Sequence, residues 1–120
     1  MSDMLFDQLA GAGCVGRIIA AWVGNVSAGL GHNVRRAVEH GIPHRLALED
    51  HSTLRIAVRL QAGALGAPYI PTRSLLGADL LRSNPTFRQT IDPWSGDPVA
   101  LIPALIPDVA ILHVQRAFGA

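Results

Sequence analysis

The strongest constraint on the fold of this chain is the apolar run at residues 15–23, in which Arg17 is the one charged residue. A strand that is apolar on both faces is typical of a sheet covered by helices on both sides. The Gly-rich stretch 24–31 follows, and residues 32–40 then predict a short helix that ends at Gly41. A strand, a glycine-rich loop and a helix in this order predict an α/β fold.

The rest of the chain alternates between helical and extended patterns. Further helices are predicted at residues 2–10 and at residues 53–65, where apolar side chains recur every three or four positions. Residues 74–86 have no clear pattern. The predicted extended segments are 44–48, 69–70, 87–91, 99–102 and 108–114. This order predicts an open, mostly parallel sheet with helices on both faces, with residues 87–91 and 99–102 forming a hairpin.

Length and composition favour one globular domain. A chain of 120 residues can bury roughly two-thirds of its unfolded surface. The fractions of apolar residues (49%) and charged residues (16%) exclude intrinsic disorder. We therefore treat residues 1–120 as a single domain.

The sequence also excludes several classes of partner. The longest apolar stretch, 99–112, is interrupted by Pro103 and Pro107 and is shorter than the ~20 residues of a membrane span. The ten basic residues are scattered arginines, which do not form the basic stripe of a nucleic-acid-binding surface. The N-terminus lacks the basic region of a signal peptide. We expect a cytoplasmic protein with no membrane or nucleic-acid partner.

The sequence contains two glycine-rich motifs, and only one of them has the order of strand and helix that a ligand site needs. Residues 11–16 match the letters G-x-G-x-x-G, but a predicted helix precedes them and a strand follows, which is the reverse of a dinucleotide site. The loop 24–31 has the correct order, at the carboxyl end of a strand. Its backbone amides and the side chains of Asn25 and Ser27 can donate hydrogen bonds to a carbonyl or carboxylate, helped by the dipole of the following helix. The alternative is an ordinary turn.

The cluster Glu49-Asp50-His51-Ser52 has two interpretations. Two acids beside a histidine and a serine are typical of hydrolytic sites. Alternatively, Asp50 or Ser52 caps the helix that follows, and the acids complement its dipole. The other histidines do not have the spacing of metal ligands, and the single cysteine, Cys14, excludes an internal disulfide and any cysteine-based zinc cluster.

Four strings taken together resemble one known family. They are AAWVGNVSAGLG, LEDHS, AGALGAPYIPTRS and PALIPDVAILHVQR, at residues 20–31, 48–52, 62–74 and 103–116. In this order and spacing they resemble the A (alpha) subunit of family I CoA-transferases, of the glutaconate CoA-transferase type. The resemblance covers roughly residues 2–116.

This resemblance implies the open α/β fold of CoA-transferases, also described as NagB–RpiA-like, and a heterodimer with a B (beta) subunit. The implied reaction is ping-pong transfer of CoA between an acyl-CoA and a carboxylic acid, either a dicarboxylic or a 3-oxo acid. A glutamate of the B subunit is the expected nucleophile, so no catalytic residue is expected on this chain. Coenzyme A is a substrate, and neither a permanently bound cofactor nor a metal is expected.

The substrate-binding residues implied by the resemblance lie in two segments. Asn25, Val26, Ser27 and Gly29 match the segment that approaches the partner's glutamate, and Glu49 and Asp50 are further candidates. One alternative is that the chain belongs to a CoA-dependent ring-cleaving hydrolase of the same superfamily, in which Glu49 or Asp50 supplies the acid.

The A subunits of this family extend beyond both ends of the matched region. We therefore expect this chain to be a partial domain, incomplete at both ends, and inactive without its B subunit. A further alternative is an inactive fragment.

Overall fold

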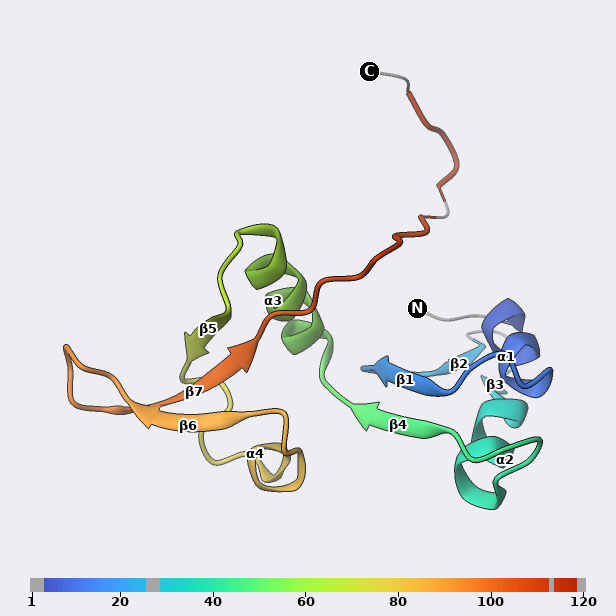
Figure 1. Ribbon diagram of the computed structural model, residues 1–120, viewed down its shortest axis with the longest axis horizontal. Coiled ribbons are helices and arrows are strands. Elements are labelled where there is room, and N and C mark those ends of the chain that lie inside the picture. Colours follow the sequence, from blue (N-terminus) through green and yellow to red (C-terminus); the bar gives the residue numbers. More distant parts are fainter. Residues whose placement is uncertain (1–3, 26–28, 113, 119–120) are drawn as a thin grey trace.

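The computed structural model describes residues 4–25, 29–112 and 114–118 (Figure 1). Four helices and seven strands alternate along this part of the chain, which confirms the α/β class. The helices are α1 (Met4–Gly11), α2 (His32–His40), α3 (Thr53–Ala64) and α4 (Asp79–Ser83). The strands are β1 (Arg17–Ala20), β2 (Gly24–Asn25), β3 (Gly29–Leu30), β4 (Ala47–Asp50), β5 (Tyr69–Thr72), β6 (Arg88–Ile91) and β7 (Pro98–Pro103).

Strands β1 and β4 form a parallel pair, and α2 lies in the connection between them. The register runs from Arg17 opposite Ala47 to Ala20 opposite Asp50. Strands β5, β7 and β6 form a separate antiparallel sheet in that order. The prediction of a mostly parallel sheet therefore holds, within the described residues, for β1 and β4 alone. The short link 92–97 between β6 and β7 permits an antiparallel pair, because parallel neighbours need a long crossover.

The first hydrophobic core lies between α1, α2 and β1. Its buried residues are Ala10, Ile18, Val34, Ala37 and Leu46. Two of these are alanines on facing helices, so α1 and α2 pack closely over the parallel pair.

The carboxylate of Asp7 fixes the start of α2. Asp7 lies on α1, is buried, and accepts a hydrogen bond from the Val34 amide at 3.0 Å and another from the Asn33 side chain at 3.0 Å. The residue before α2 is Gly31, which supplies no side-chain cap. A Cβ atom at Gly31 would lie 2.9 Å from Asp7 Oδ1, so glycine is needed for this close approach.

The second core joins the antiparallel sheet to α3 and α4. It contains Leu75, Phe87, Ala100 and Ile102, with Val58 of α3 packed against them. Figure 1 shows α3 between this sheet and the parallel pair. Helix α4 lies within residues 74–86, for which no element was predicted.

The helix ends follow the sequence signals. Helix α2 ends at Gly41, which adopts a left-handed conformation with φ 69°, as predicted. Helix α3 follows Ser52, whose side chain accepts a hydrogen bond from the Arg55 amide at 3.4 Å. Of the two capping residues considered, Ser52 is therefore the one that caps α3.

The predicted last strand, 108–114, is wrong: residues 108–112 and 114 have no secondary structure, and His113 lies outside the described residues. Figure 1 shows this segment leading away from the rest of the molecule. The chain is fastened just before it, where the Leu105 amide donates to the Arg59 carbonyl at 2.9 Å. A sequence suited to a buried strand forms one only when a neighbouring strand pairs with it, and no strand among the described residues does so.

We predict that Asp7→Ala lowers the free energy of unfolding by about 1–2 kcal/mol, because the Val34 amide then loses its cap. Asp79→Ala is the matched control, since Asp79 is exposed in the first turn of α4. Urea unfolding followed by circular dichroism measures both. Equal stability of the two variants would contradict this role of Asp7.

Candidate functional site

A cavity lies where the carboxyl ends of the two parallel strands meet. Its volume is about 250 Å³, and Ala20 and Asp50, the last residues of β1 and β4, line it. Val23 and Gly31, which flank the Gly-rich hairpin, line it as well. We call it the strand-end cavity. In open α/β folds, ligands collect at this edge of the sheet.

The walls of the strand-end cavity are mainly apolar, with charges from three residues. Trp22, Val34, Val38 and Leu48 supply apolar surface. Asp50 supplies a carboxylate, and Arg35 and Glu39 of α2 pair with each other at 2.8 Å. Apolar walls with a few polar groups are typical of sites for small organic molecules.

The Gly-rich loop is a hairpin. Strands β2 and β3 pair with Gly24 opposite Leu30 and Asn25 opposite Gly29. Gly29 has φ 84°, a conformation that favours glycine. Two of the predicted binding residues, Val26 and Ser27, lie outside the described residues. The base of the hairpin borders the strand-end cavity through Val23 and Gly31, and the binding roles of Asn25, Val26, Ser27 and Gly29 stay predictions.

The N-terminus of α2 is less open to a ligand than the sequence suggested. The sequence predicted that the dipole of this helix would help the amides of the loop 24–31 to bind an anion. The Val34 amide instead donates to Asp7. A ligand at the hairpin therefore has to rely on other donors.

Glu49 and Asp50 have different surroundings although they are adjacent. Asp50 reaches the strand-end cavity, whereas Glu49 enters a cluster of polar side chains. Glu49 Oε1 accepts hydrogen bonds from His51 Nε2 at 2.7 Å, Thr86 Oγ1 at 2.9 Å and Arg59 Nη1 at 3.0 Å. Glu49 Oε2 pairs with Arg17. We call these five side chains the Glu49 cluster.

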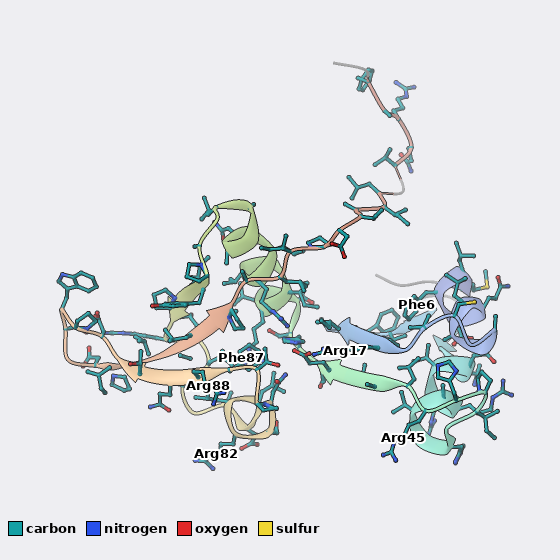
Figure 2. The ribbon with its side chains drawn as sticks, viewed as in Figure 1. Phe6, Arg17, Arg45, Arg82, Phe87 and Arg88 are labelled. Carbon is teal, nitrogen blue, oxygen red and sulfur yellow. The ribbon has the colours of Figure 1, made fainter. Side chains whose placement is uncertain are left out.

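The Glu49 cluster joins four parts of the chain. Arg17 comes from β1, Arg59 from α3, and Thr86 from the segment before β6. Figure 2 shows the side chains of Arg17 and Phe87 at the junction between the two sheets. The His51 ring packs edge-on against Phe87, with ring centres 5.3 Å apart. The cluster therefore connects the first core to the second.

The pKa of Glu49 is lowered to about 2 from an ordinary value of 4.5. Burial opposes this change, but hydrogen bonds from His51, Arg17 and Thr86, together with the positive charge of Arg59, favour the ionised form. Glu49 is therefore a carboxylate near neutral pH. It is not suited to donate a proton, and the cluster already occupies both of its oxygens.

His51 is buried, and its Nδ1 atom has no hydrogen-bond partner. With Nε2–H donating to Glu49, Nδ1 keeps an unused lone pair in the neutral ring. The sequence pointed to His51 through the run Glu49-Asp50-His51-Ser52, but it did not point to Arg17, Arg59 or Thr86. A single arginine within an otherwise apolar strand is the signal that was available for Arg17, although its side chain is 63% exposed.

Two further classes of site are absent from the described parts of the chain. Residues 4–25, 29–112 and 114–118 contain no group of three or more His, Cys, Asp or Glu side chains that could hold a metal ion. No helix among them is long and apolar enough to cross a membrane.

Comparison with curated proteins identifies a related polypeptide. No family model matches the chain. It is 37% identical over 115 residues, 96% of its length, to the A subunit of 3-oxoadipate CoA-transferase from Pseudomonas knackmussii. Over this region the chain is similar to the A subunit of a CoA-transferase. It is also 42% identical over 112 residues, 92% of its length, to an uncharacterised protein of Archaeoglobus fulgidus. The chain spans 41% of the first relative and 24% of the second.

Solved structures confirm the CoA-transferase fold. A variant of the decarboxylase AibA/AibB superimposes with a TM-score of 0.79 at 31% identity, over 94% of this chain and 43% of that one. Glutaconate CoA-transferase from Acidaminococcus fermentans gives a TM-score of 0.73 at 24% identity, over 82% of this chain and 36% of that one. The second match is evidence for the fold alone.

We predict that Glu49→Gln lowers the free energy of unfolding by about 3 kcal/mol, since it leaves Arg59 buried without its carboxylate. The matched control is Glu39→Gln, which removes an exposed pair with Arg35 and is expected to cost less than about 0.5 kcal/mol. Chemical unfolding at pH 7 compares the two. Similar losses from both variants would mean that the cluster contributes no more than a surface pair.

The Glu49 cluster also predicts a pH dependence. The folded-state pKa lies below the ordinary value, so the unfolded chain binds the proton more tightly. The stability due to Glu49 is therefore present above pH 4.5 and is lost as the pH falls towards about 2. Unfolding midpoints measured across this range should fall less steeply in Glu49→Gln than in the unaltered chain. Parallel curves would contradict the assignment.

Proposed function

We propose that this chain supplies the A-subunit half of a CoA-transferase site. The observation that carries the proposal is the similarity to a 3-oxoadipate CoA-transferase A subunit over 96% of the chain. The strand-end cavity supports it, since it lies at the carboxyl ends of β1 and β4, beside the hairpin that the family resemblance singles out. In this proposal the cavity receives the acyl group of the substrate.

The proposed reaction is ping-pong and uses a glutamate of a partner B subunit. Its carboxylate attacks the thioester carbonyl of the acyl-CoA, forming a mixed anhydride and releasing the CoA thiolate. The thiolate then attacks the glutamyl carbonyl, which gives a glutamyl-CoA thioester and frees the acid. The acceptor carboxylate repeats the two steps in reverse, so the glutamate is restored and a new acyl-CoA leaves.

The contributions of this chain are binding and positioning. Val38 and Trp22 shape the apolar part of the strand-end cavity. Asp50 and the hairpin residues Asn25 and Ser27 are the proposed polar contacts. Glu49 does not serve as the nucleophile, because its carboxylate is held by the Glu49 cluster.

A second candidate reaction is decarboxylation, in which the substrate loses a carboxyl group as CO₂. The match to the decarboxylase AibA/AibB, at 31% identity and a TM-score of 0.79, favours it. Hydrolysis is a further alternative, in which Asp50 supplies the acid, since both oxygens of Glu49 are engaged by the Glu49 cluster.

We expect CoA exchange when the chain is expressed together with a B subunit encoded beside it. Incubation with a 3-oxoacyl-CoA donor and a dicarboxylic acid acceptor should produce the new acyl-CoA. Mass spectrometry of the separated polypeptides should find the CoA adduct on the B subunit. Release of CO₂ without CoA exchange would identify a decarboxylase, and release of free CoA without exchange would identify a hydrolase. A CoA adduct on Glu39 or Glu49 would show that the nucleophile is not on the partner subunit.

The role of the strand-end cavity is tested by filling it. Val38→Phe should raise KM at least ~10-fold for a bulky acyl group and less for acetyl-CoA, because the added ring takes up acyl space. Leu54→Phe is the control, since Leu54 is exposed on α3. Thermal melts check that both variants fold. The same change in KM for both acyl groups would argue that the acyl group binds elsewhere.

A further inference from the structure

Asn84, which directly follows α4, is a buried polar residue that the proposed function does not use. It is 7% exposed. Its backbone amide donates to the Leu80 carbonyl at 3.0 Å, and its backbone carbonyl accepts a hydrogen bond from the Phe87 amide at 3.3 Å. Phe87 belongs to the second core. The backbone that carries the Asn84 side chain is therefore fixed by α4 and by the second core.

The side chain of Asn84 uses both its acceptor and its donor. Oδ1 accepts a hydrogen bond from the Thr86 amide at 2.9 Å, and Nδ2 donates to the Asp50 carbonyl at 3.3 Å. Because a backbone amide can only donate, the bond from Thr86 identifies the side-chain oxygen and leaves the nitrogen for Asp50. Asn84 thus connects the end of β4 to a residue 34 positions later in the chain.

The peptide group between Asp50 and His51 is held from two directions. Its N–H, which belongs to His51, donates to the Ala20 carbonyl of β1 at 2.9 Å. Its carbonyl, which belongs to Asp50, accepts the hydrogen bond from Asn84. A peptide group is planar, so hydrogen bonds at both its N–H and its C=O fix the orientation of the whole plane. The backbone next to the Asp50 side chain therefore has little freedom to turn.

The orientation of this peptide group decides where the Asp50 carboxylate lies. Leu48 and Asp50 both line the strand-end cavity, as expected for residues two positions apart on a strand. Glu49 enters the Glu49 cluster, where its Oε1 accepts a hydrogen bond from Thr86 Oγ1 at 2.9 Å. Residues 84–86 therefore contact both acids, Asn84 through the backbone of Asp50 and Thr86 through the side chain of Glu49. Substitutions can separate the two contacts.

We propose that Asn84 is a positioning residue for the strand-end cavity. It holds the peptide group between Asp50 and His51 and thereby directs the Asp50 carboxylate towards the ligand. Asn84 itself does not line this cavity. The inference rests on the proposed function, in which Asp50 is a polar contact of the substrate.

The first test measures hydrogen exchange of the His51 amide by NMR on the full chain. Asn84→Asp keeps the acceptor for the Thr86 amide and loses the donor to the Asp50 carbonyl. The His51 amide should then exchange at least ~5-fold faster, the effect of losing one hydrogen bond. Thr86→Val is the matched control, since it removes a hydrogen bond to Glu49 from the same segment and leaves both bonds of the Asn84 side chain. Its His51 amide should exchange as in the unaltered chain.

A second variant covers the case in which Asn84→Asp does not fold. In Asn84→Ser the hydroxyl can still accept from the Thr86 amide, but the shorter side chain does not reach the Asp50 carbonyl. The same increase in His51 exchange is expected.

The second test measures substrate binding in the complex with the B subunit. Asn84→Asp should raise KM for the acyl-CoA at least ~3-fold, in the range of coupling between residues in contact. In a chain that already carries Asp50→Asn, the same substitution should leave KM unchanged, because Asn84 acts through the Asp50 carboxylate. Thr86→Val should change KM little in either background.

Three results overturn the proposal: an unprotected His51 amide in the unaltered chain, unchanged His51 exchange in both Asn84 variants, or an increase in KM that persists in the Asp50→Asn background. Failure of the proposed function has a different signature, namely no CoA exchange by the unaltered complex. In that case the His51 amide alone decides whether Asn84 holds the end of β4.

Discussion

The bond between Glu49 and Arg59 holds the two cores of this molecule together. Arg59 is buried on α3, and it pairs at 3.0 Å with Glu49 at the end of the parallel pair, which compensates its charge for leaving water. Arg59 also donates to the Pro103 carbonyl of β7, and its own carbonyl holds the Leu105 amide. One arginine thus connects β4, β7 and the C-terminal segment.

Glu49 and Asp50 are adjacent but have different surroundings, because successive side chains of a strand point to opposite faces. Asp50 reaches the strand-end cavity, while Glu49 enters the Glu49 cluster. The cluster uses the ionised form of Glu49, whose pKa is lowered to about 2. Asp50 is exposed and lines the strand-end cavity. Of the two adjacent acids, Asp50 is therefore the one proposed for binding at this strand end, and Glu49 fixes the strand.

The α/β class, α2 and α3 were predictable from local signals. Gly41 and Ser52 mark helix ends by their own chemistry, and the structure places both as predicted. The hairpin of β6 and β7 was predictable from its turn residues. Residues 108–112 were not, because a strand needs a neighbour and local composition does not supply one. The partners of Glu49 are equally non-local, since Arg17 and Thr86 lie 32 and 37 positions away along the chain.

The capping of α2 by Asp7 has a consequence for the hairpin 24–30. Most loops that precede a helix also supply its cap, and a change in the loop then disturbs the helix. Here the cap comes from α1, and the loop contributes only Gly31, which leaves room for the Asp7 carboxylate. The hairpin can therefore be exchanged in length and sequence while α2 keeps its start. If the proposed function holds, substitutions in the hairpin can therefore be used to test substrate preference without disturbing the start of α2.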